Sequence, residues 1–412
     1  MALVVIGKPG NGGAFVAPSN AIAGWAKATP AQPRDGTDRN PPHAVRAAAA
    51  PKLPLWRLAL KALLDGGPGT CHFAITSICN ARCGFCSFAI DQLPREAQHS
   101  VSLDDAKVAL DILARNNIRF IHLTGGEPLI HRDLDSIVRH SRRAGMSSVL
   151  ITNGWLLTAE RVDRLAEAGL TSLVISIDAP SATVHDRNRG LEGLSERISK
   201  ANRWCRLRGL PTTASVTMSH LIGDYSQLPK FLRSMGFEAV TFSYPLSTLR
   251  SSYLSYRDSE LVAYSPEELE AAFEAVKVLK KSFPVLNPAA SLEDMQRHVR
   301  GQPERFGCLA GYKFFYLDWH LDLYRCHNWD RPLCHIFEFD LTKRVHDGCT
   351  ACMIDCYRDD SVMQHVAVAI SDGLAAAKKG QFGEAWRRWS DRRNFISLKA
   401  VLDEAPVWRK RV

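Results

Sequence analysis

The chain has 412 residues, of which 46% are hydrophobic and 23% charged, and its formal net charge is +9. This length is sufficient for one large domain with appendages, or for two domains, with an ample core. Eleven cysteines in a chain that shows no secretory signal argue against a disulfide framework, and no window approaches the roughly 20 apolar residues that cross a bilayer. We therefore expect a cytoplasmic protein whose clustered cysteines are metal ligands.

The first part of the sequence shows little periodicity. Residues 1–50 are rich in Gly, Ala, Pro and Asn, so we expect a mostly disordered leader. Residues 51–70 are interpreted as an amphipathic helix and lead-in. The helix at 51–64 is compatible with a membrane surface, and the alternative is that it covers the bottom of a barrel.

Between residues 71 and 245, apolar strand-like segments alternate with amphipathic helical segments. One helix is expected to begin at the capping pair Ser102 and Asp105, and another to run from Thr158 to Gly169. Six strand–helix units with nearly continuous apolar strands predict an α/β fold, a partial (β/α)6 barrel with ligand groups at the carboxyl ends of its strands. The strands are expected at residues 71–77, 120–126, 147–154, 172–178, 212–219 and 239–245.

Three cysteines, Cys79, Cys83 and Cys86, follow the first strand with the spacing C-x3-C-x2-C. One tight loop can direct three thiolates at one place, which leaves a cubic iron-sulfur cluster one iron short of a protein ligand. Two alternatives stay open here. The cysteines could be buried as small hydrophobes, or they could bind zinc, although no fourth Cys or His lies in the loop.

The stretch CNARCGFC resembles the signature of the radical S-adenosylmethionine (SAM) superfamily. The resemblance implies that the three cysteines hold a [4Fe-4S] cluster and that the amino and carboxyl groups of SAM occupy its fourth iron. It further implies reductive cleavage of SAM to a 5′-deoxyadenosyl radical, with a flavodoxin- or ferredoxin-type reductant. In that family the residue at the position of Phe85 lies against the adenine.

Residues after the second and third strands add to this resemblance. The run TGGEP resembles the GGE motif of the family, in which Gly125, Gly126 and Glu127 would hold the SAM amino group. Two glycines let the backbone approach a ligand closely, and a carboxylate accepts hydrogen bonds from an ammonium group. Asn153, at the end of the third strand, is a further candidate for contact with the nucleoside.

The fourth strand carries Ser176 and Asp178, which a period of two places on one face. An acid and a hydroxyl at a strand end can bind the two hydroxyls of a ribose, and the alternative is that they cap the next helix. The segment SIDAPSATVHDRNRG also resembles the ribose strand and following loop of the family, which implies that Arg189 lies near the SAM carboxylate.

A second group of five cysteines lies within 49 positions: Cys308, Cys326, Cys349, Cys352 and Cys356. Its first two members resemble the opening of the SPASM and twitch auxiliary domains of radical SAM enzymes, which hold one or two additional [4Fe-4S] clusters. Two features depart from that pattern. Leu321 stands where the family usually has Gly, and even with Cys334 the cysteines fall short of the seven usual for two clusters. We predict one auxiliary [4Fe-4S] cluster and one cysteine that is spare or a reactive thiol; a zinc knuckle is the alternative.

The expected domains are a radical SAM barrel at residues 71–285, an auxiliary-cluster domain at 300–360 and a basic helical tail at 361–412. In the tail, ten Lys and Arg stand against five Asp and Glu. This excess forms a solvated helix face, or it attracts anionic lipid, nucleic acid or an acidic partner, so peripheral membrane contact is one interpretation. We expect no nucleic-acid partner.

The predicted function is reductive cleavage of SAM for oxidation or rearrangement of a small-molecule, lipid or peptide substrate, assisted by the auxiliary cluster. The segment CTACMIDCYRDDSVMQHV is similar to the end of the hopene adenosyltransferase family, so adenosyl transfer to an isoprenoid lipid is a second hypothesis. A third, from another class, is a non-catalytic iron-sulfur protein for redox sensing or electron transfer. Such a protein needs no SAM pocket, and the GGEP run counts against it.

Overall fold

The computed structural model describes residues 63–246, 249–253 and 258–409. These residues belong to one compact unit of the chain, Pro54–Val412. The predicted leader at 1–50 and all but the last two residues of the helix predicted at 51–64 lie outside the described residues. No helix in the described part of the chain combines the length and the apolar content that a membrane crossing needs.

The strands of the described residues are β1 Gly69–Thr76, β2 Ile118–Gly125, β3 Ser147–Thr152, β4 Ser172–Ile177, β5 Thr212–Thr217, β6 Val240–Ser243, β7 Phe314–Leu317, β8 Asp322–Tyr324 and β9 Cys334–His335. They form one sheet in the order β6-β5-β4-β3-β2-β1-β7-β8-β9. Pairing is parallel from β6 through β7 and antiparallel for β8 and β9. All six predicted strands form, and the prediction of an α/β partial barrel is confirmed.

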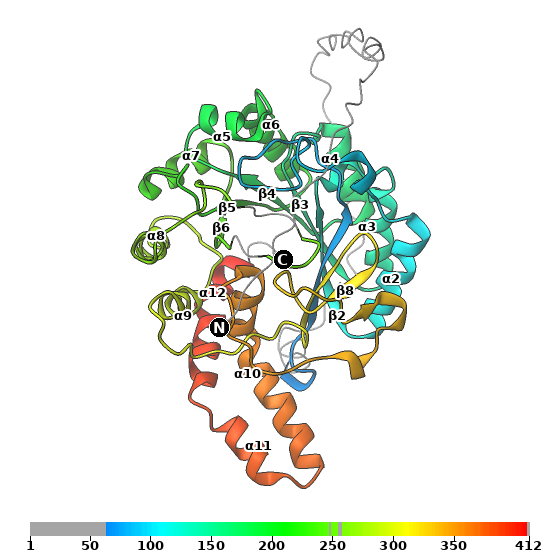
Figure 1. Ribbon diagram of the computed structural model, residues 1–412, viewed down its shortest axis with the longest axis vertical. Helices are drawn as coiled ribbons and strands as arrows, with labels where there is room; N and C mark the ends of the chain where they lie inside the picture. Colours follow the sequence, from blue (N-terminus) through cyan, green and yellow to red (C-terminus); the bar gives the residue numbers. More distant parts are fainter. Residues whose placement is uncertain (1–62, 247–248, 254–257, 410–412) are drawn as a thin grey trace, which may run out of the picture. The chain divides into compact units, whose positions relative to one another are not determined.

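The helices are α2 Leu103–Arg115, α3 Leu134–Arg143, α4 Ala159–Ala168, α5 Ala182–Arg189, α6 Leu194–Leu207, α7 Leu228–Ser234, α8 Pro266–Leu279, α9 Ala289–Val299, α10 Asp355–Lys378, α11 Phe382–Trp389 and α12 Arg393–Arg409. Figure 1 shows the strands in an arc with α2 to α8 along its outer side. α10 contacts β6 and α9, and both α11 and α12 pack against α10. The main core lies between the sheet and the outer helices and includes the fully buried Phe73, Leu123, Leu150, Ile175 and Val216.

Local capping fixes the helix ends where the sequence predicts them. The Ser102 hydroxyl accepts a hydrogen bond from the backbone N–H of Asp105 (3.1 Å), and α2 begins there. The Thr158 hydroxyl caps α4 in the same way, and α4 ends at Gly169, whose φ of +96° lies in the left-handed region. These caps satisfy backbone groups that a helix end leaves without partners.

The three C-terminal strands continue the barrel sheet, since β7 pairs in parallel with β1. At the turn between β7 and β8, the Asp318 carboxylate accepts hydrogen bonds from the backbone N–H groups of His320 (2.9 Å) and Asp322 (3.0 Å). Leu321, which replaces the expected Gly, has a φ of +68°. The turn thus keeps a backbone conformation that favours glycine, and burial of the Leu321 side chain offsets the strain. The predicted boundaries between domains stay a prediction.

Candidate functional site

The C-x3-C-x2-C motif lies in the loop that follows β1, at the carboxyl end of that strand. Cys83 is buried, whereas Cys79 and Cys86 are half-buried, and Phe85 packs in the main core. Burial raises the pKa of all three thiols, that of Cys79 to about 12, and the nearby charge of Cys83 raises those of Cys79 and Cys86 further. The structure therefore brings the three thiols together.

The end of α5 holds this cysteine loop. The backbone N–H of Arg82 donates to the carbonyl of Arg189 (2.8 Å), and that of Gly84 donates to the side-chain oxygen of Asn188 (3.2 Å). Burial raises the pKa of Cys83, and the positive charge of Arg189 opposes that rise. A cation beside these thiols favours the thiolate, which is the form that binds metal.

A buried ion pair joins two of the predicted SAM-binding residues. The Arg189 guanidinium donates to both carboxylate oxygens of Asp178, at 2.5 and 2.9 Å, and Asn188 donates to the same carboxylate at 2.7 Å. Burial by itself would raise the pKa of Asp178, but Arg189 outweighs it and holds that pKa well below its usual range. Asp178 and Arg189, predicted for the ribose and the SAM carboxylate, thus contact each other, and Ser176 lies half-buried two residues before Asp178.

Gly125 and Gly126 bring β2 against the backbone that leads into the cysteine loop. The backbone N–H of Gly126 donates to the Thr76 carbonyl (2.8 Å), and that of Glu127 donates to the Ile78 carbonyl (2.7 Å). A Cβ atom on Gly125 would overlap the Thr76 carbonyl, and one on Gly126 would overlap the Ile78 carbonyl. The close approach expected for a ligand is therefore made by the chain's own backbone.

Glu127 is fully buried and ties β2 to the end of β3. Its Oε1 accepts hydrogen bonds from the Leu129 N–H (3.0 Å) and the Thr152 hydroxyl (2.7 Å), and its Oε2 accepts one from the Asn153 N–H (2.7 Å). Burial raises the pKa of Glu127, and these hydrogen bonds oppose the rise. The Asn153 side chain donates in turn to Asn80 of the cysteine loop (2.8 Å). A carboxylate oxygen accepts more than one hydrogen bond, so Oε2 can accept another from an ammonium group.

The second cysteine group lies in a separate buried cluster that contains Cys308, Cys326, Cys349, Cys352 and Cys356. The backbone N–H of Cys308 donates to the Cys349 carbonyl at 2.8 Å. Burial raises the pKa of Cys308 and that of Cys326, and the charges of Cys349 and Cys352 raise both further. These four thiols therefore lie near one another.

Two cysteines differ from these four. The Cys356 sulfur lies 4.0 Å from Nδ1 of His327, and burial, neighbouring aspartates and the charge of Cys326 raise its pKa. Cys334 lies in β9 and packs in the main core. Cys356 thus shares the buried cluster of the four cysteines and also borders His327, whereas Cys334 lies in the main core.

The donor geometry can be compared with two kinds of metal centre. Across the described residues, no three His, Cys, Asp or Glu side chains lie close enough to hold one metal ion. A structural zinc site takes four ligand atoms on one ion, whereas the thiolates of an iron-sulfur cluster each bind a different iron. The grouped thiols of this chain supply the donor type that an iron-sulfur cluster needs.

Aromatic rings connect the two cysteine groups. The ring of Phe88, two residues after Cys86, lies 6.1 Å from that of Tyr253, and Tyr253 stacks on His327 with centroids 3.7 Å apart. His327 follows Cys326 directly in the sequence. Both cysteine groups therefore border one continuous set of rings inside the barrel.

Sequence reasoning did not identify two histidines in the same interior as a pair. His72 of β1 and His122 of β2 are register partners, and their rings lie 4.6 Å apart. His72 also contacts His327, at 5.4 Å between centroids. Burial lowers the pKa of His122 to about 4, so its imidazole is neutral at pH 7. The sequence does contain a signal for this pair. Each histidine alternates along its strand with apolar residues that face the outer helices, which indicates that the histidine faces the barrel interior.

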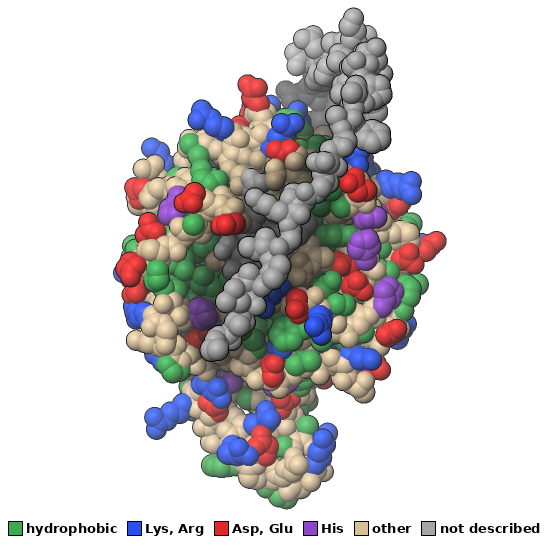
Figure 2. Space-filling model, viewed as in Figure 1, with side chains coloured by type: hydrophobic (Ala, Val, Ile, Leu, Met, Phe, Trp, Pro, Cys, Tyr) green, Lys and Arg blue, Asp and Glu red, His purple; other side chains and the backbone are tan. Residues whose placement is uncertain are grey.

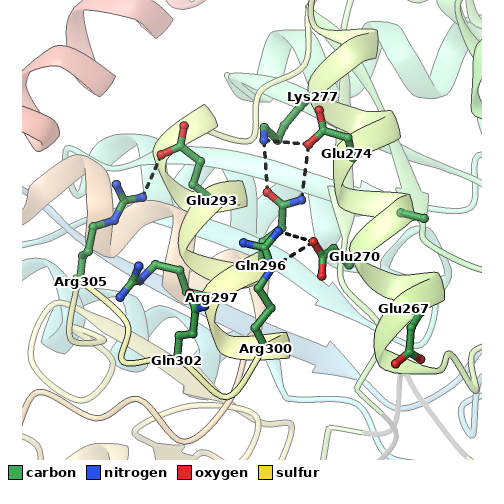
Figure 3. Close-up of a pocket in the computed structure, with 11 residues that line it drawn as sticks. Glu267, Glu270, Glu274, Lys277, Glu293, Gln296, Arg297, Arg300, Gln302 and Arg305 are labelled. Atoms are coloured by element: carbon green, nitrogen blue, oxygen red, sulfur yellow. Dashed lines mark hydrogen bonds and ion pairs between the residues drawn. The ribbon is translucent and has the colours of Figure 1, made fainter.

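A surface groove of about 660 Å³ lies between α8 and α9 (Figure 3). Its charged side chains pair with one another: Arg300 with Glu270, and Lys277 with Glu274 at 2.8 Å. None of the predicted site residues lines it. The Arg300–Glu270 pair joins the end of α9 to α8, the Lys277–Glu274 pair lies within α8, and both are separate from the candidate site.

Residues 73–233 match the family model described as the Radical SAM superfamily. The chain is 33% identical to the PqqA peptide cyclase of Rhodopseudomonas palustris over 174 residues. That aligned segment covers 41% of this chain and 46% of the cyclase. It is also 33% identical to the AdoMet-dependent heme synthase of Methanosarcina barkeri over 156 residues. That aligned segment covers 38% of this chain and 44% of the heme synthase. The chain spans less than half the length of these two relatives.

Two solved structures share the fold. Native anSMEcpe with bound AdoMet superposes with a TM-score of 0.51 at 13% identity, over 82% of this chain and 100% of that chain. Streptococcus suis SuiB bound to the precursor peptide SuiA superposes with a TM-score of 0.50 at 16% identity, over 69% and 67%. The matched segment begins in β1 and includes the cysteine loop, Glu127, Asp178 and Arg189. This segment of the chain, residues 73–233, is therefore similar to the radical SAM superfamily.

Proposed function

We propose that this chain is a radical SAM enzyme whose [4Fe-4S] cluster is held by Cys79, Cys83 and Cys86. The observation that carries the proposal is the grouping of these three thiols at the carboxyl end of β1, beside the cation of Arg189. When bound, the cluster supplies the electron that cleaves SAM to methionine and a 5′-deoxyadenosyl radical. A ferredoxin- or flavodoxin-type protein is the proposed source of that electron.

The surrounding residues bind and orient SAM in this proposal. The carboxylate of Glu127 accepts hydrogen bonds from the SAM amino group through Oε2, the oxygen that carries a single backbone bond in the structure. The guanidinium of Arg189 faces the SAM carboxylate, since it lies close enough to Cys79 and Cys83 to affect their pKa values. Ser176 and Asp178 bind the ribose, Phe85 borders the adenine, and the Gly125–Gly126 turn holds Glu127 against the cysteine loop.

We further propose one auxiliary [4Fe-4S] cluster held by Cys308, Cys326, Cys349 and Cys352. Four thiolates complete the ligand set of such a cluster. The mutual influence of these four thiols on their pKa values supports the assignment, and Cys356 is distinguished by the contact of its sulfur with Nδ1 of His327 at 4.0 Å. Cys356 is then the spare cysteine, paired with His327.

The proposed reaction is oxidation or rearrangement of a substrate that reaches the interior between the two cysteine groups. The aromatic contacts from Phe88 through Tyr253 to His327 support a shared interior. A peptide is the substrate class that we favour. The similar proteins include a PqqA peptide cyclase and the structure of SuiB bound to the precursor peptide SuiA. Adenosyl transfer to an isoprenoid lipid is the competing outcome.

The test is SAM cleavage by anaerobically reconstituted protein with dithionite. We expect release of 5′-deoxyadenosine, and we expect Cys83→Ala to release none. Cys205→Ala is the matched control, because Cys205 is fully buried in α6 and packs in the main core.

With a deuterated substrate, deuterium in 5′-deoxyadenosine indicates hydrogen abstraction, whereas a larger adenosyl adduct indicates transfer. Absence of 5′-deoxyadenosine with several reductants would instead favour a redox sensor.

A further inference from the structure

Two C-terminal helices expose large apolar side chains. On α11, Phe382 is 72% exposed and Trp386 is 69% exposed; on α12, the values are 74% for Phe395, 46% for Leu398 and 63% for Leu402. The spacing is i and i+4 on α11 and i, i+3 and i+7 on α12, so within each helix these side chains share one face of that helix. We call these five residues the tail apolar surface.

Other faces of the same helices are anchored to the rest of the molecule. Ala385 of α11 is buried. The Ser397 hydroxyl of α12 accepts a hydrogen bond from the Val366 N–H of α10 (3.1 Å), and Glu404 of α12 pairs with Lys280 (2.8 Å). Each helix therefore packs against the rest of the molecule through one of its faces. The tail apolar surface lies on the solvent-exposed faces of the same helices.

Basic side chains accompany the tail apolar surface. From residue 378 to residue 403 the sequence has seven Lys and Arg against three Asp and Glu, a net charge of +4. The acids are all used in ion pairs, with Arg387, Arg388, Arg393 and Lys399 as partners. In the described part of the chain, Lys378, Lys379 and Arg392 form no ion pair and are exposed. Figure 2 shows Lys and Arg (blue) beside apolar side chains (green) at the lower end of the molecule.

We propose that the tail apolar surface docks this protein onto an anionic lipid bilayer. Aromatic and leucine side chains enter the boundary between headgroups and acyl chains, and the unpaired basic side chains lie beside lipid phosphates. Exposed apolar patches of this kind mark interaction sites. A second copy of the chain is a poorer partner, because it would place one net charge of +4 against another. This inference is independent of the proposed catalytic function.

Vesicle sedimentation of the full chain tests the proposal. We expect binding to vesicles of phosphatidylglycerol and phosphatidylcholine, and much weaker binding to phosphatidylcholine alone. Raising the salt concentration from about 0.1 M to about 1 M shortens the Debye length from about 10 to about 3 Å and should release most of the protein. Equal binding to both vesicles, or binding to neither, overturns the proposal.

Variants separate the apolar and the basic contributions. Phe382→Ser with Trp386→Ser should lower vesicle affinity at least tenfold, because both side chains leave the bilayer boundary. Leu207→Ser is the matched control, since Leu207 is 82% exposed at the end of α6 and should leave affinity unchanged. Neutralising Lys378, Lys379 or Arg392 with Gln should lower affinity about fivefold each, which corresponds to about 1 kcal/mol per charge.

Folding and self-association are checked on the same variants. All of them should keep the melting temperature of the wild type, because the substituted side chains are exposed. Sedimentation velocity should find the wild type in one state across protein concentrations. A concentration-dependent oligomer that disappears with Phe382→Ser and Trp386→Ser would identify a second copy as the occupant and overturn the lipid proposal.

Discussion

The two cysteine groups of this chain are built in different ways. The first comes from eight consecutive residues of one loop after β1. The second is assembled from three separate segments: Cys308 before β7, Cys326 after β8 and Cys349–Cys352 before α10. Spacing alone is therefore enough to indicate the first group, whereas the second takes shape only when the sheet and α10 have formed.

Each group also has one arginine that is held by an aspartate, and the two pairs differ in burial. The side chains of Arg189 and Asp178 are 9% and 0% exposed, whereas those of Arg325 and Asp347 are 3% and 49% exposed. Water therefore screens the second pair and reaches the first very little. The first pair should matter more for folding.

The largest expected effect that separates the two groups is on iron content. Cys352→Ala should lose the iron of the auxiliary cluster and retain SAM cleavage, because the first cysteine group does not depend on it. Cys83→Ala should do the reverse. Iron and sulfide per chain, measured with 5′-deoxyadenosine release, check both.

Two further variants assign the C-terminal ligands. Cys334→Ala is the control and should keep all iron, because Cys334 packs in the main core. Cys356→Ala should also keep the iron if Cys356 is spare. A loss with Cys356→Ala as large as that with Cys352→Ala would contradict the four-ligand assignment.

The same contrast explains what could be predicted from sequence. The six barrel strands and the capped helices follow from local patterns, and each occurs as expected, from β1 through β6. Parallel pairing of β7 with β1 joins residues more than 240 positions apart, which no local pattern encodes. The same holds for the His72–His122 contact and for the role of Gly125 and Gly126, whose close neighbours are the backbones of Thr76 and Ile78.

Replacing Arg189 should have the next largest effect. Arg189→Met leaves the carboxylate of Asp178 buried without its cation, so the free energy of unfolding should fall by about 3–5 kcal/mol at pH 7. The pKa of Asp178 is lower in the folded state than its unfolded value, so the stabilisation is present above the unfolded pKa and is lost as the pH falls. Wild type and variant should therefore converge in acid.

Urea unfolding of the apoprotein from pH 7 downward measures this effect. Arg189→Met combined with Asp178→Asn is the matched control, because it removes the buried charge together with its partner and should recover part of the loss. A difference between wild type and Arg189→Met that stays constant with pH would show that lost packing, rather than charge, is responsible.

Replacing Arg325 should have a smaller effect, confined to the second group. The Arg325 guanidinium donates to both carboxylate oxygens of Asp347 at 2.8 Å, and Asp347 accepts a hydrogen bond from the Cys349 N–H at 3.2 Å. Arg325→Gln removes the paired hydrogen bonds and should cost about 1–2 kcal/mol, because Asp347 is half in water. Auxiliary iron should be lost faster to a chelator, with SAM cleavage unchanged. Equal loss of iron from both cysteine groups would contradict this localisation.

The smallest expected effect concerns a positive-φ position that carries a side chain. Gly125 has a φ of +124° without a side chain, whereas Leu321, in the turn between β7 and β8, has a φ of +68°. Leu321→Gly relieves strain of about 1–2 kcal/mol and loses about 1.5–3 kcal/mol of side-chain burial, so the net loss of stability should be about 1 kcal/mol. Leu323→Gly, in β8 where φ is not positive, removes a fully buried side chain without relief and should cost about 1–2 kcal/mol more. Denaturant midpoints of the two variants measure the difference, and equal losses would mean that the Leu321 turn carries no strain.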